Sequence, residues 1–290
     1  MDKLEKALEK AREQRKITLE QQGRQQSGPP PAKLSNAAYT PTATSVQIED
    51  NFLEAHHIIA HHTRNQDADT FRILRTKILQ IMSQGGMKTL GITSANYGDG
   101  KTTIGLNLAV SIALDLKQTV LLVDLDLRKP SVPEYLGLQP QYGISDYFLH
   151  NVPIAKCFLR PSFDRFTILP AGQVMVNSSE VLGSPQMAAL ADELKTRYDD
   201  RIIIYDLPPT LVQDDPIAFL PHVDAVLLVV NDGVTKINEL KHALNVLSGT
   251  NVIGTVLNHP GEKKKSKLYT KFTTMLNTFI HSSDQSADAN

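Results

Sequence analysis

Short apolar runs alternate with amphipathic stretches through much of this 290-residue chain. Six apolar runs predict buried strands, at 88–93, 119–124, 166–169, 201–206, 224–230 and 251–257. Between them, apolar residues recur at helical spacing and predict helices at 101–116, 186–197, 215–221 and 235–248. Strands that are apolar on both faces and separated by helices are typical of a parallel sheet covered on both sides. We therefore expect an α/β fold with a doubly wound, mostly parallel sheet, which would bind ligands at the carboxyl ends of its strands.

The segments outside this alternating region predict a different organisation. Leucines and alanines in residues 1–20 form a narrow apolar stripe at helical spacing, which predicts an N-terminal helix. Because so short a helix is marginal alone, the stripe would either meet a partner or belong to a frayed, solvated helix. Residues 21–50 are rich in Gln, Pro, Ser and Thr, which is typical of a flexible, disordered linker. We expect a folded domain at 51–260, with a helix at 67–82 ahead of the alternating region, and then a basic and polar C-terminal tail at 261–290.

Composition and charge narrow the choice of partners and compartment. The formal net charge of −1 gives no global attraction to nucleic acid or to an anionic membrane, so we expect no nucleic-acid partner. No apolar run approaches the roughly 18 residues of a membrane span. The single cysteine, Cys157, excludes an internal disulfide and is consistent with a reducing compartment. We therefore expect a cytoplasmic protein that would reach the inner membrane through a partner.

The stretch SANYGDGKTT, residues 94–103, lies between a predicted strand and a predicted helix. Its spacing matches a Walker A phosphate loop, with Ala95 in place of the usual first glycine. Gly98 and Gly100 would let backbone N–H groups turn onto phosphate oxygens, and the helix that begins at Lys101 would direct its positive dipole end at them. The sequence therefore predicts ATP and Mg²⁺ as ligands. The expected contacts come from Asn96, Tyr97, Gly98, Asp99, Gly100, Lys101, Thr102 and Thr103.

Two further predicted strands end in acidic residues. Asp124 and Asp126 end the run TVLLVDLD, and Asp206 ends the run RIIIYD. Because the carboxyl ends of parallel strands meet at one edge of a sheet, we expect these carboxylates to face the phosphate loop. One or two of them would hold Mg²⁺ together with nucleotide phosphates, and the third would accept a proton from an attacking hydroxyl or orient a water. A kinase and an ATPase both fit this arrangement.

Three segments together resemble one family. ITSANYGDGKTTIGLNLAVSIA, VLLVDLDLRKPSV and IIIYDLPP are similar to the Walker A, A′ and B motifs of the bacterial tyrosine kinases, the P-loop autokinases of exopolysaccharide and capsule export. The resemblance covers about residues 54–258, and EKALEKAREQR near the N-terminus resembles the subgroup found in exopolysaccharide loci with exosortase systems. It implies ATP-dependent phosphorylation of tyrosines, usually in the tail of a neighbouring subunit, and a role in exopolysaccharide synthesis or export.

This resemblance also implies a role for each residue of the site. Lys101 and Thr102 would hold phosphate and metal, and Asp126 and Asp206 would hold Mg²⁺. Asp124 would be the general base toward the tyrosine hydroxyl, although the choice between Asp124 and Asp126 stays open. The expected catalytic residues are thus Lys101, Asp124 and Asp126, and the expected metal ligands are Thr102, Asp126 and Asp206.

Two charged patterns are expected to support the site or the assembly. Arg128 and Lys129 follow the A′ acids as in the family and would steady the phosphate or the acceptor loop, or form a solvated basic pair. Asp69, Arg72 and Arg75 occupy the spacing of the family's Glu-x-x-Arg-x-x-Arg helix, which assembles subunits in a ring. The resemblance therefore implies a homo-oligomer, dimer or ring, and a membrane polysaccharide co-polymerase or activator protein as partner.

The tyrosines depart from the family's pattern. The tail beyond residue 260 holds Tyr269 alone, where the family commonly has a cluster of tyrosines. Tyr205 lies in a predicted buried strand, which makes it a poor acceptor. The expected phospho-acceptors are therefore Tyr269 and Tyr39, which lies in the predicted linker.

Two other functions remain open. A MinD/ParA-like positioning ATPase would share the fold and the strand-end acids. Its phosphate loop, however, has a lysine where this chain has Asn96 and a glycine where it has Tyr97. A non-catalytic ATP-binding regulatory scaffold would bind nucleotide without phosphoryl transfer. Separately, the histidines of HHIIAHH would place His57 and His61 on one face of a helix, and we expect a surface or interface stretch there in preference to a metal site.

Overall fold

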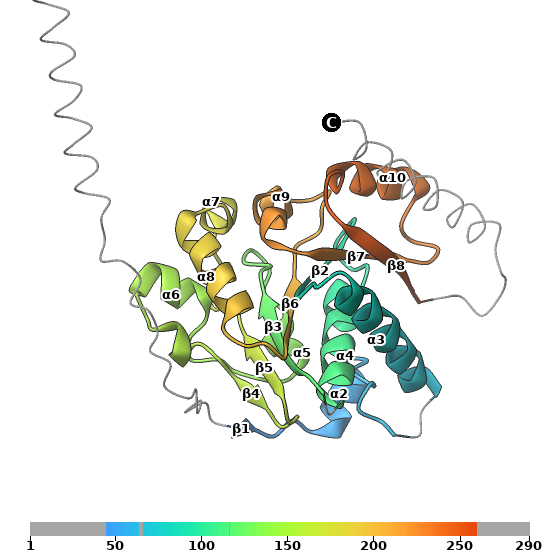
Figure 1. Ribbon diagram of the computed structural model, residues 1–290, viewed down its shortest axis with the longest axis horizontal. Coiled ribbons are helices and arrows are strands. Elements are labelled where there is room, and N and C mark those ends of the chain that lie inside the picture. Colours follow the sequence, from blue (N-terminus) through green and yellow to red (C-terminus); the bar gives the residue numbers. More distant parts are fainter. Residues whose placement is uncertain (1–44, 64–65, 116, 260–290) are drawn as a thin grey trace, which may run out of the picture. The chain divides into compact units, whose positions relative to one another are not determined.

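The computed structural model describes residues 45–63, 66–115 and 117–259, and Figure 1 shows the arrangement of their helices and strands. The helix predicted at the N-terminus, most of the predicted linker and the predicted tail lie outside the described residues. Among the described helices, none combines the length and the hydropathy that crossing a bilayer requires.

The described part begins earlier than the sequence predicts. Strand β1, Ser45–Val46, pairs in parallel with β4, Arg160–Pro161, and helix α2 spans Asp50–Ala55. Strand β1 and the first residue of α2 thus lie within the range predicted as linker, whose boundaries stay a prediction. A pairing of two residues rests on backbone hydrogen bonds and leaves no apolar run that a sequence pattern can reveal.

Six parallel strands form the central sheet in the order β5-β3-β6-β2-β7-β8, so the prediction of a doubly wound parallel sheet is confirmed. Each strand lies within one residue of its predicted position. The strands are β2 (Thr89–Ser94), β3 (Thr119–Asp124), β5 (Phe166–Leu169), β6 (Arg201–Asp206), β7 (Ala225–Asn231) and β8 (Val252–Asn258). All residues of β2 and β5 are buried, as are nearly all those of β3, β6 and β7, because helices cover both faces.

The long helices lie where the sequence predicts helices, and the structure also contains several short helices. The longer helices are α3 (Gln66–Gln84), α4 (Lys101–Ala113), α8 (Pro185–Thr196) and α10 (Ile237–Val246). The shorter ones are α5 (Val132–Tyr135), α6 (Ile144–His150), η1 (Ile154–Lys156), α7 (Ser178–Leu182), α9 (Asp215–Phe219) and η2 (Leu220–His222). Ser184 begins α8 as an N-cap, since its hydroxyl accepts from the backbone N–H of Met187 at 3.1 Å.

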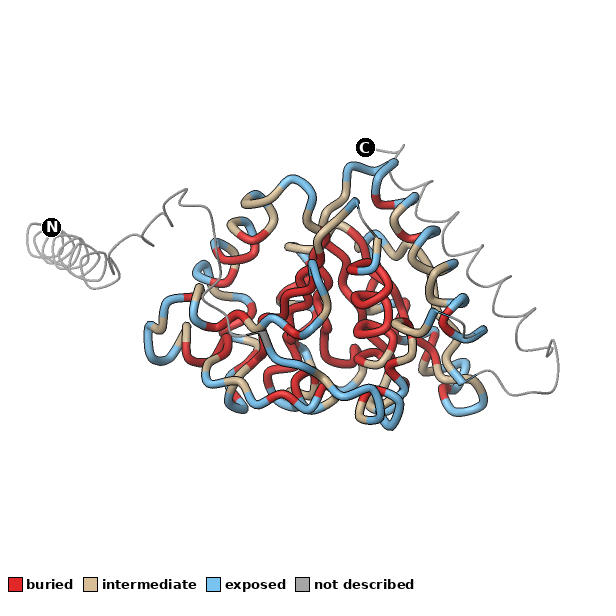
Figure 2. Tube along the Cα trace, turned by 90° about the horizontal axis from the view of Figure 1, so that it is seen from below, coloured by how far each residue is buried: buried red, intermediate tan, exposed pale blue. Residues whose placement is uncertain are grey.

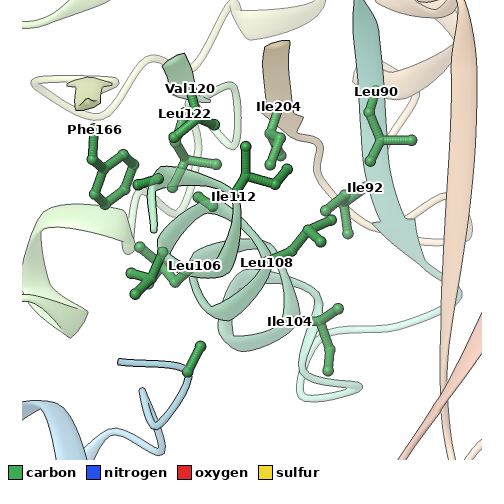
Figure 3. Close-up of a cluster of buried hydrophobic side chains, with 14 of the residues drawn as sticks. Leu90, Ile92, Ile104, Leu106, Leu108, Ile112, Val120, Leu122, Phe166 and Ile204 are labelled. Atoms are coloured by element: carbon green, nitrogen blue, oxygen red, sulfur yellow. The ribbon is translucent and has the colours of Figure 1, made fainter. Parts of the chain in front are cut away.

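Helix α4 lies at the centre of the larger core. Figure 3 shows its apolar side chains extending on several sides of the helix, among residues of β2, β3, β5 and β6. Helix α3 packs on α4, so α4 lies between the sheet and α3 and is buried almost all round. Ile204 of β6 belongs to this core, whereas the next residue, Tyr205, contacts Phe219 of α9 on the opposite face, with ring centroids 4.7 Å apart. Figure 2 shows the buried residues gathered in the interior and the exposed residues on the outside.

The histidine-rich stretch HHIIAHH is not a helix, so His57 and His61 do not share a helical face. His57 has a φ of +58°, and the backbone N–H groups of Ile59 and Ala60 donate to Oδ1 of Asn107 at 2.8 and 3.0 Å. The amide of Asn107 donates in turn to the carbonyl oxygen of His57 at 2.8 Å. This buried asparagine of α4 therefore substitutes for secondary structure and fixes the stretch against the core.

Candidate nucleotide-binding site

The carboxyl ends of β2, β3 and β6 lie next to one another and form the site. Strand β6 pairs with both β2 and β3, so it lies between them. In the pairing of β3 with β6, Asp124 and Asp206 are register partners, which brings two of the predicted carboxylates side by side. The phosphate loop follows β2 and leads directly into α4. The strand order thus brings the loop and both acidic strand ends to one edge of the sheet.

Two glycines give the phosphate loop its turn. Gly98 and Gly100 have φ angles of +85° and +92°, in the left-handed region that favours glycine. A Cβ on Gly100 would collide with the side-chain amide of Asn258, whose Nδ2 donates to the carbonyl oxygen of Asp99 at 3.0 Å. A Cβ on Gly98 would meet no described atom within 4 Å. Gly100 is therefore required by conformation and by space, and Gly98 by conformation alone.

Polar groups brace the backbone of the loop. The buried carboxylate of Asp99 accepts from the backbone N–H of Asn96 at 2.9 Å and from the hydroxyl of Thr235 at 3.0 Å. Asn231, at the end of β7, donates to the carbonyl oxygen of Gly98 at 3.2 Å. These bonds hold the loop in one shape, so that less conformational entropy is lost when a ligand binds. The side chain of Asp99 turns to the loop itself, and its expected contact with nucleotide stays a prediction.

Lys101 begins α4 with its side chain buried among carboxylates. Its Nζ lies 3.1 Å from Oδ2 of Asp126 and 3.4 Å from Oδ1 of Asp206. Burial alone would lower the pKa of Lys101, but the carboxylates of Asp206 and Asp126 raise it overall, so the ammonium group stays charged. The N–H groups in the first turn of α4 add the positive end of the helix dipole. This corner of the site therefore suits phosphate oxygens.

Thr102 and Asp206 are hydrogen-bonded to each other next to Lys101. The hydroxyl of Thr102 donates to Oδ2 of Asp206 at 2.7 Å and lies 3.3 Å from the hydroxyl of Ser131. Asp206 is fully buried, and burial raises its pKa above the usual range, although Lys101 and the hydroxyl of Thr102 act in the opposite direction. Thr102 and Asp206 thus offer oxygen atoms side by side next to the phosphate loop.

Asp124 is bound on both of its oxygens. Its Oδ1 accepts from the backbone N–H of Asp126 at 3.2 Å, and its Oδ2 accepts from those of Ser131 and Val132 at 3.2 and 3.1 Å. Burial, together with the nearby carboxylate of Asp206, raises the pKa of Asp124 to about 7. Asp124 therefore shapes the loop that follows β3, and its carboxylate is fully buried.

The donor set fits a divalent cation bound together with phosphate. The three carboxylates of Asp124, Asp126 and Asp206 against the one ammonium of Lys101 give a net charge of −2 (3 negative less 1 positive) when all are ionised. Such buried charge is unfavourable without a counter-ion. Within the described residues, no three His, Cys, Asp or Glu side chains form a metal cage of their own. Mg²⁺ does not need one, because it retains water and phosphate ligands beside one or two carboxylates. Thr102, Asp126 and Asp206 are suitable ligands for it.

Tyr97 reaches across the site from the phosphate loop. Its hydroxyl lies 3.4 Å from Oδ1 of Asp126, and the amide of Gln213, in the loop after β6, donates to the same hydroxyl. Burial and the adjacent Asp126 raise the pKa of Tyr97 to about 12. The Nζ of Lys129 lies 5.0 Å from the centroid of the Tyr97 ring, within the range of a cation–π interaction. Tyr97 thus connects the phosphate loop with the loops that follow β3 and β6.

The two basic residues after the A′ acids contact different partners. The Nε of Arg128 donates to the hydroxyl of Ser178 in α7 at 2.7 Å, and its Nη2 lies 3.2 Å from Oδ1 of the buried Asp215 in α9. Arg128 therefore links the loop after β3 to α7 and α9. Lys129 instead lies over the phosphate loop.

The residues predicted to assemble subunits lie on α3 and bond within the chain. Arg72 forms an ion pair with Asp69 and donates to the carbonyl oxygen of His62. Arg75 donates to the carbonyl oxygen of Ser111 in α4 at 2.8 Å. A neighbouring subunit would have to share or replace these contacts, and the role in assembly stays a prediction.

The predicted phospho-acceptors Tyr39 and Tyr269 lie outside the described residues. Tyr205, predicted to be a poor acceptor because it lies in a buried strand, is 1% exposed. Thr103, the last residue of the predicted nucleotide contacts, is half-buried, and its carbonyl oxygen accepts from the side chain of Asn107 at 2.9 Å within α4. Its contact with nucleotide also stays a prediction.

Several polar residues that the sequence motifs do not indicate hold the loops of the site in place, namely Ser131, Gln213, Asn231, Thr235 and Asn258. Two of these, Asn231 and Asn258, each end a strand, as the aspartates do. The reasoning applied to the strand-end aspartates would therefore have found both. The other three lie in loops without a recognisable motif, and their contacts depend on the folded backbone.

Proteins named as tyrosine kinases are similar to this chain over the described region. Residues 87–248, more than half of the chain, match the AAA domain family. Tyrosine-protein kinase Wzc of Salmonella typhi is 33% identical over 192 residues, which are 66% of this chain and 26% of Wzc. Tyrosine-protein kinase YwqD of Bacillus subtilis is 31% identical over 206 residues, 70% of this chain and 84% of YwqD. The succinoglycan biosynthesis transport protein ExoP of Rhizobium meliloti is 29% identical over 207 residues, 69% of this chain and 26% of ExoP. The chain thus spans about a quarter of Wzc and ExoP and most of YwqD.

Solved structures show the same relationship. The chimerical protein CapA2B2 superimposes with a TM-score of 0.67 at 27% identity, covering 74% of this chain and 93% of the other. The cell division ATPase MinD of Pyrococcus furiosus gives a TM-score of 0.52 at 26% identity, covering 62% and 75%. The fold is thus shared with a cell division ATPase, whereas the similarity in sequence extends over most of the length of a kinase, YwqD. The chain belongs to the family of bacterial P-loop tyrosine-protein kinases.

Proposed function

We propose that this chain is an ATP-dependent protein-tyrosine kinase that regulates the synthesis or export of an exopolysaccharide. One observation supports the proposal above all others. The acidic ends of β3 and β6 converge on Lys101 and Thr102 where the phosphate loop enters α4. Such a cluster suits a nucleoside triphosphate with its metal ion. The kinship with proteins named as tyrosine kinases, and with a succinoglycan transport protein, supports the reaction and its setting.

In this proposal, the phosphate loop and the first turn of α4 bind the triphosphate. Lys101 would exchange its contacts with Asp126 and Asp206 for the phosphate oxygens. Thr102, Asp126 and Asp206 would hold Mg²⁺, which when bound neutralises charge on the phosphates. The loop is already braced by Asn258 and its neighbours, so that these groups would stabilise the developing charge of the transferred phosphoryl group without reorganising.

The proton of the acceptor tyrosine would pass to Asp126. As the phenolic oxygen forms its bond to the γ-phosphorus, the bond from that phosphorus to the ADP oxygen breaks. A pKa near 7 would suit Asp124 as a general base, but geometry comes first, and three backbone N–H groups already occupy its oxygens. Asp126 by contrast faces a phenolic hydroxyl, that of Tyr97, at 3.4 Å. We therefore assign the shaping of the loop to Asp124 and the base to Asp126, which would accept the proton on the carboxylate oxygen that does not hold Mg²⁺.

The cellular setting belongs to the same proposal. We propose a cytoplasmic homo-oligomer, dimer or ring, that works with a membrane polysaccharide co-polymerase or activator protein. The spacing of Asp69, Arg72 and Arg75 supports the assembly, and autophosphorylation would fall on Tyr269 or Tyr39.

Transfer of labelled phosphate tests the proposal. The wild-type chain is incubated with γ-labelled ATP and Mg²⁺, with and without candidate membrane partners, and labelled residues are mapped. We expect label on tyrosine in the wild type and in Lys241→Met, an exposed control on α10, and loss of that label in Lys101→Met. Release of free phosphate without labelled protein would identify a positioning ATPase instead. Tight nucleotide binding with neither product would identify a regulatory scaffold.

A further inference from the structure

The cluster at the edge of the sheet is short of positive charge. Among the described residues, Lys101 is the cation in ion-pair contact with its carboxylates, and that charge is divided between Asp126 and Asp206. A triphosphate would add more negative charge than Mg²⁺ alone neutralises. The loop also has the neutral Asn96 where the positioning ATPases carry a lysine. A second protein cation near the terminal phosphate would therefore stabilise the bound nucleotide.

Lys129 is the basic residue that can supply this charge. The guanidinium of its neighbour Arg128 is already bound to Ser178 and Asp215. The backbone N–H of Lys129 donates to Oδ1 of Asp126 at 3.2 Å, which fixes the residue beside the cluster. Its ammonium group forms no ion pair within the described part of the chain and lies 5.0 Å from the centroid of the Tyr97 ring.

The ring of Tyr97 is a fixed platform for that ammonium group. The backbone of Tyr97 belongs to the phosphate loop, and its hydroxyl is held between Asp126 and Gln213. A cation–π contact at a partly exposed site contributes about 0.5–1 kcal/mol. That is enough to favour one region among the many rotamers of a lysine side chain. The ring therefore keeps a mobile cation next to the loop that would hold the phosphates.

We propose that Lys129 contacts the terminal phosphate of the bound nucleotide and that Tyr97 positions it there. This inference rests on the proposed binding of ATP and names the group that distinguishes ATP from ADP at the same site. Lys129 is the residue that touches the substrate, and Tyr97 acts through it.

Nucleotide affinities measured in the presence of Mg²⁺ test the inference. The affinities of ADP and of a non-hydrolysable ATP analogue are measured by calorimetry for the wild type, Lys129→Met and the exposed control Lys241→Met. We expect Lys129→Met to weaken binding of the ATP analogue about tenfold and to change ADP binding less than twofold, because ADP lacks the terminal phosphate. Lys241→Met should retain both affinities.

Substitutions of Tyr97 test its positioning role. Tyr97→Phe retains the ring and should keep the preference for the ATP analogue, whereas Tyr97→Leu should lose it. The double variant of Tyr97→Leu with Lys129→Met should bind the analogue no more weakly than Lys129→Met alone, because both changes remove one contact. Equal losses for the analogue and ADP, or no loss in Lys129→Met, would overturn the inference. A folded wild type that binds neither nucleotide would instead refute the proposed function itself.

Discussion

Lys101 holds together a buried cluster of like charges, so Lys101→Met should destabilise the nucleotide-free protein in a pH-dependent way. The ammonium lies 3.1 and 3.4 Å from two carboxylates, with Lys101 only 7% exposed. At an effective dielectric constant of about 20, each contact corresponds to roughly 5 kcal/mol of Coulomb energy, most of which offsets desolvation. Removing one partner of such a pair costs about 3–5 kcal/mol, because the remaining charges stay buried.

The pH dependence follows from the carboxylates. Burial already raises the pKa of Asp124 to about 7 and that of Asp206 above its usual range. Loss of the ammonium would raise them further. A carboxylate whose pKa is higher in the folded than in the unfolded state stabilises the folded protein at low pH. This contribution to the free energy of unfolding is lost as the pH rises through the pKa of the folded state. The difference in unfolding free energy between wild type and Lys101→Met should therefore be small at pH 5 and largest at pH 8.

Urea unfolding at the two pH values measures this difference. The exposed control Lys241→Met should change the free energy of unfolding by less than about 0.5 kcal/mol at either pH. A loss of less than about 1 kcal/mol of unfolding free energy in Lys101→Met at pH 8 would refute the reasoning, because removing one partner of a buried ion pair is expected to cost about 3 kcal/mol or more. An equal cost at pH 5 and pH 8 would show that the loss comes from packing and not from buried charge.

Two further predictions concern the phosphate loop and the sheet. Gly98→Ala should destabilise the protein by roughly 1–2 kcal/mol, the strain of a residue with a Cβ in the left-handed conformation. Gly100→Ala should cost more than this, because its Cβ would also collide with the side chain of Asn258. Thermal denaturation compares the two variants. Tyr205→Phe should leave stability unchanged or raise it by about 1 kcal/mol in urea unfolding, because the buried hydroxyl of Tyr205 finds no hydrogen-bond partner among the described residues. A loss of stability in Tyr205→Phe would contradict this reading.

Much of the fold could be predicted because each long element has a strong local pattern. RIIIYD, the strand β6, is apolar on both faces, and that pattern alone places it inside a covered sheet. The short helices α5 and α6 escaped prediction, since four and seven residues are too few to display helical periodicity. Strand β1 escaped as well, because its two residues pair through the backbone with a segment more than a hundred positions away.

The site could be predicted in outline from motifs and topology, but not in its contacts. The phosphate loop is a local motif, and the carboxyl ends of parallel strands bring Asp124 and Asp206 together. That Asp124 is occupied by backbone N–H groups depends on how residues 131 and 132 fold back over it. The bracing of the loop by Asn258 joins positions 159 residues apart, which no local pattern could indicate.

Every proposal above depends on the binding of Mg²⁺ and ATP at the strand-end aspartates, and calorimetry can measure that binding. The affinity for a non-hydrolysable ATP analogue is measured with and without Mg²⁺, for the wild type and for Asp206→Asn. We expect Mg²⁺ to strengthen binding at least tenfold in the wild type and to have little effect in Asp206→Asn, where a ligand of the metal is lost. Folded wild-type protein without affinity for the analogue, or the same response to Mg²⁺ in both proteins, would contradict it.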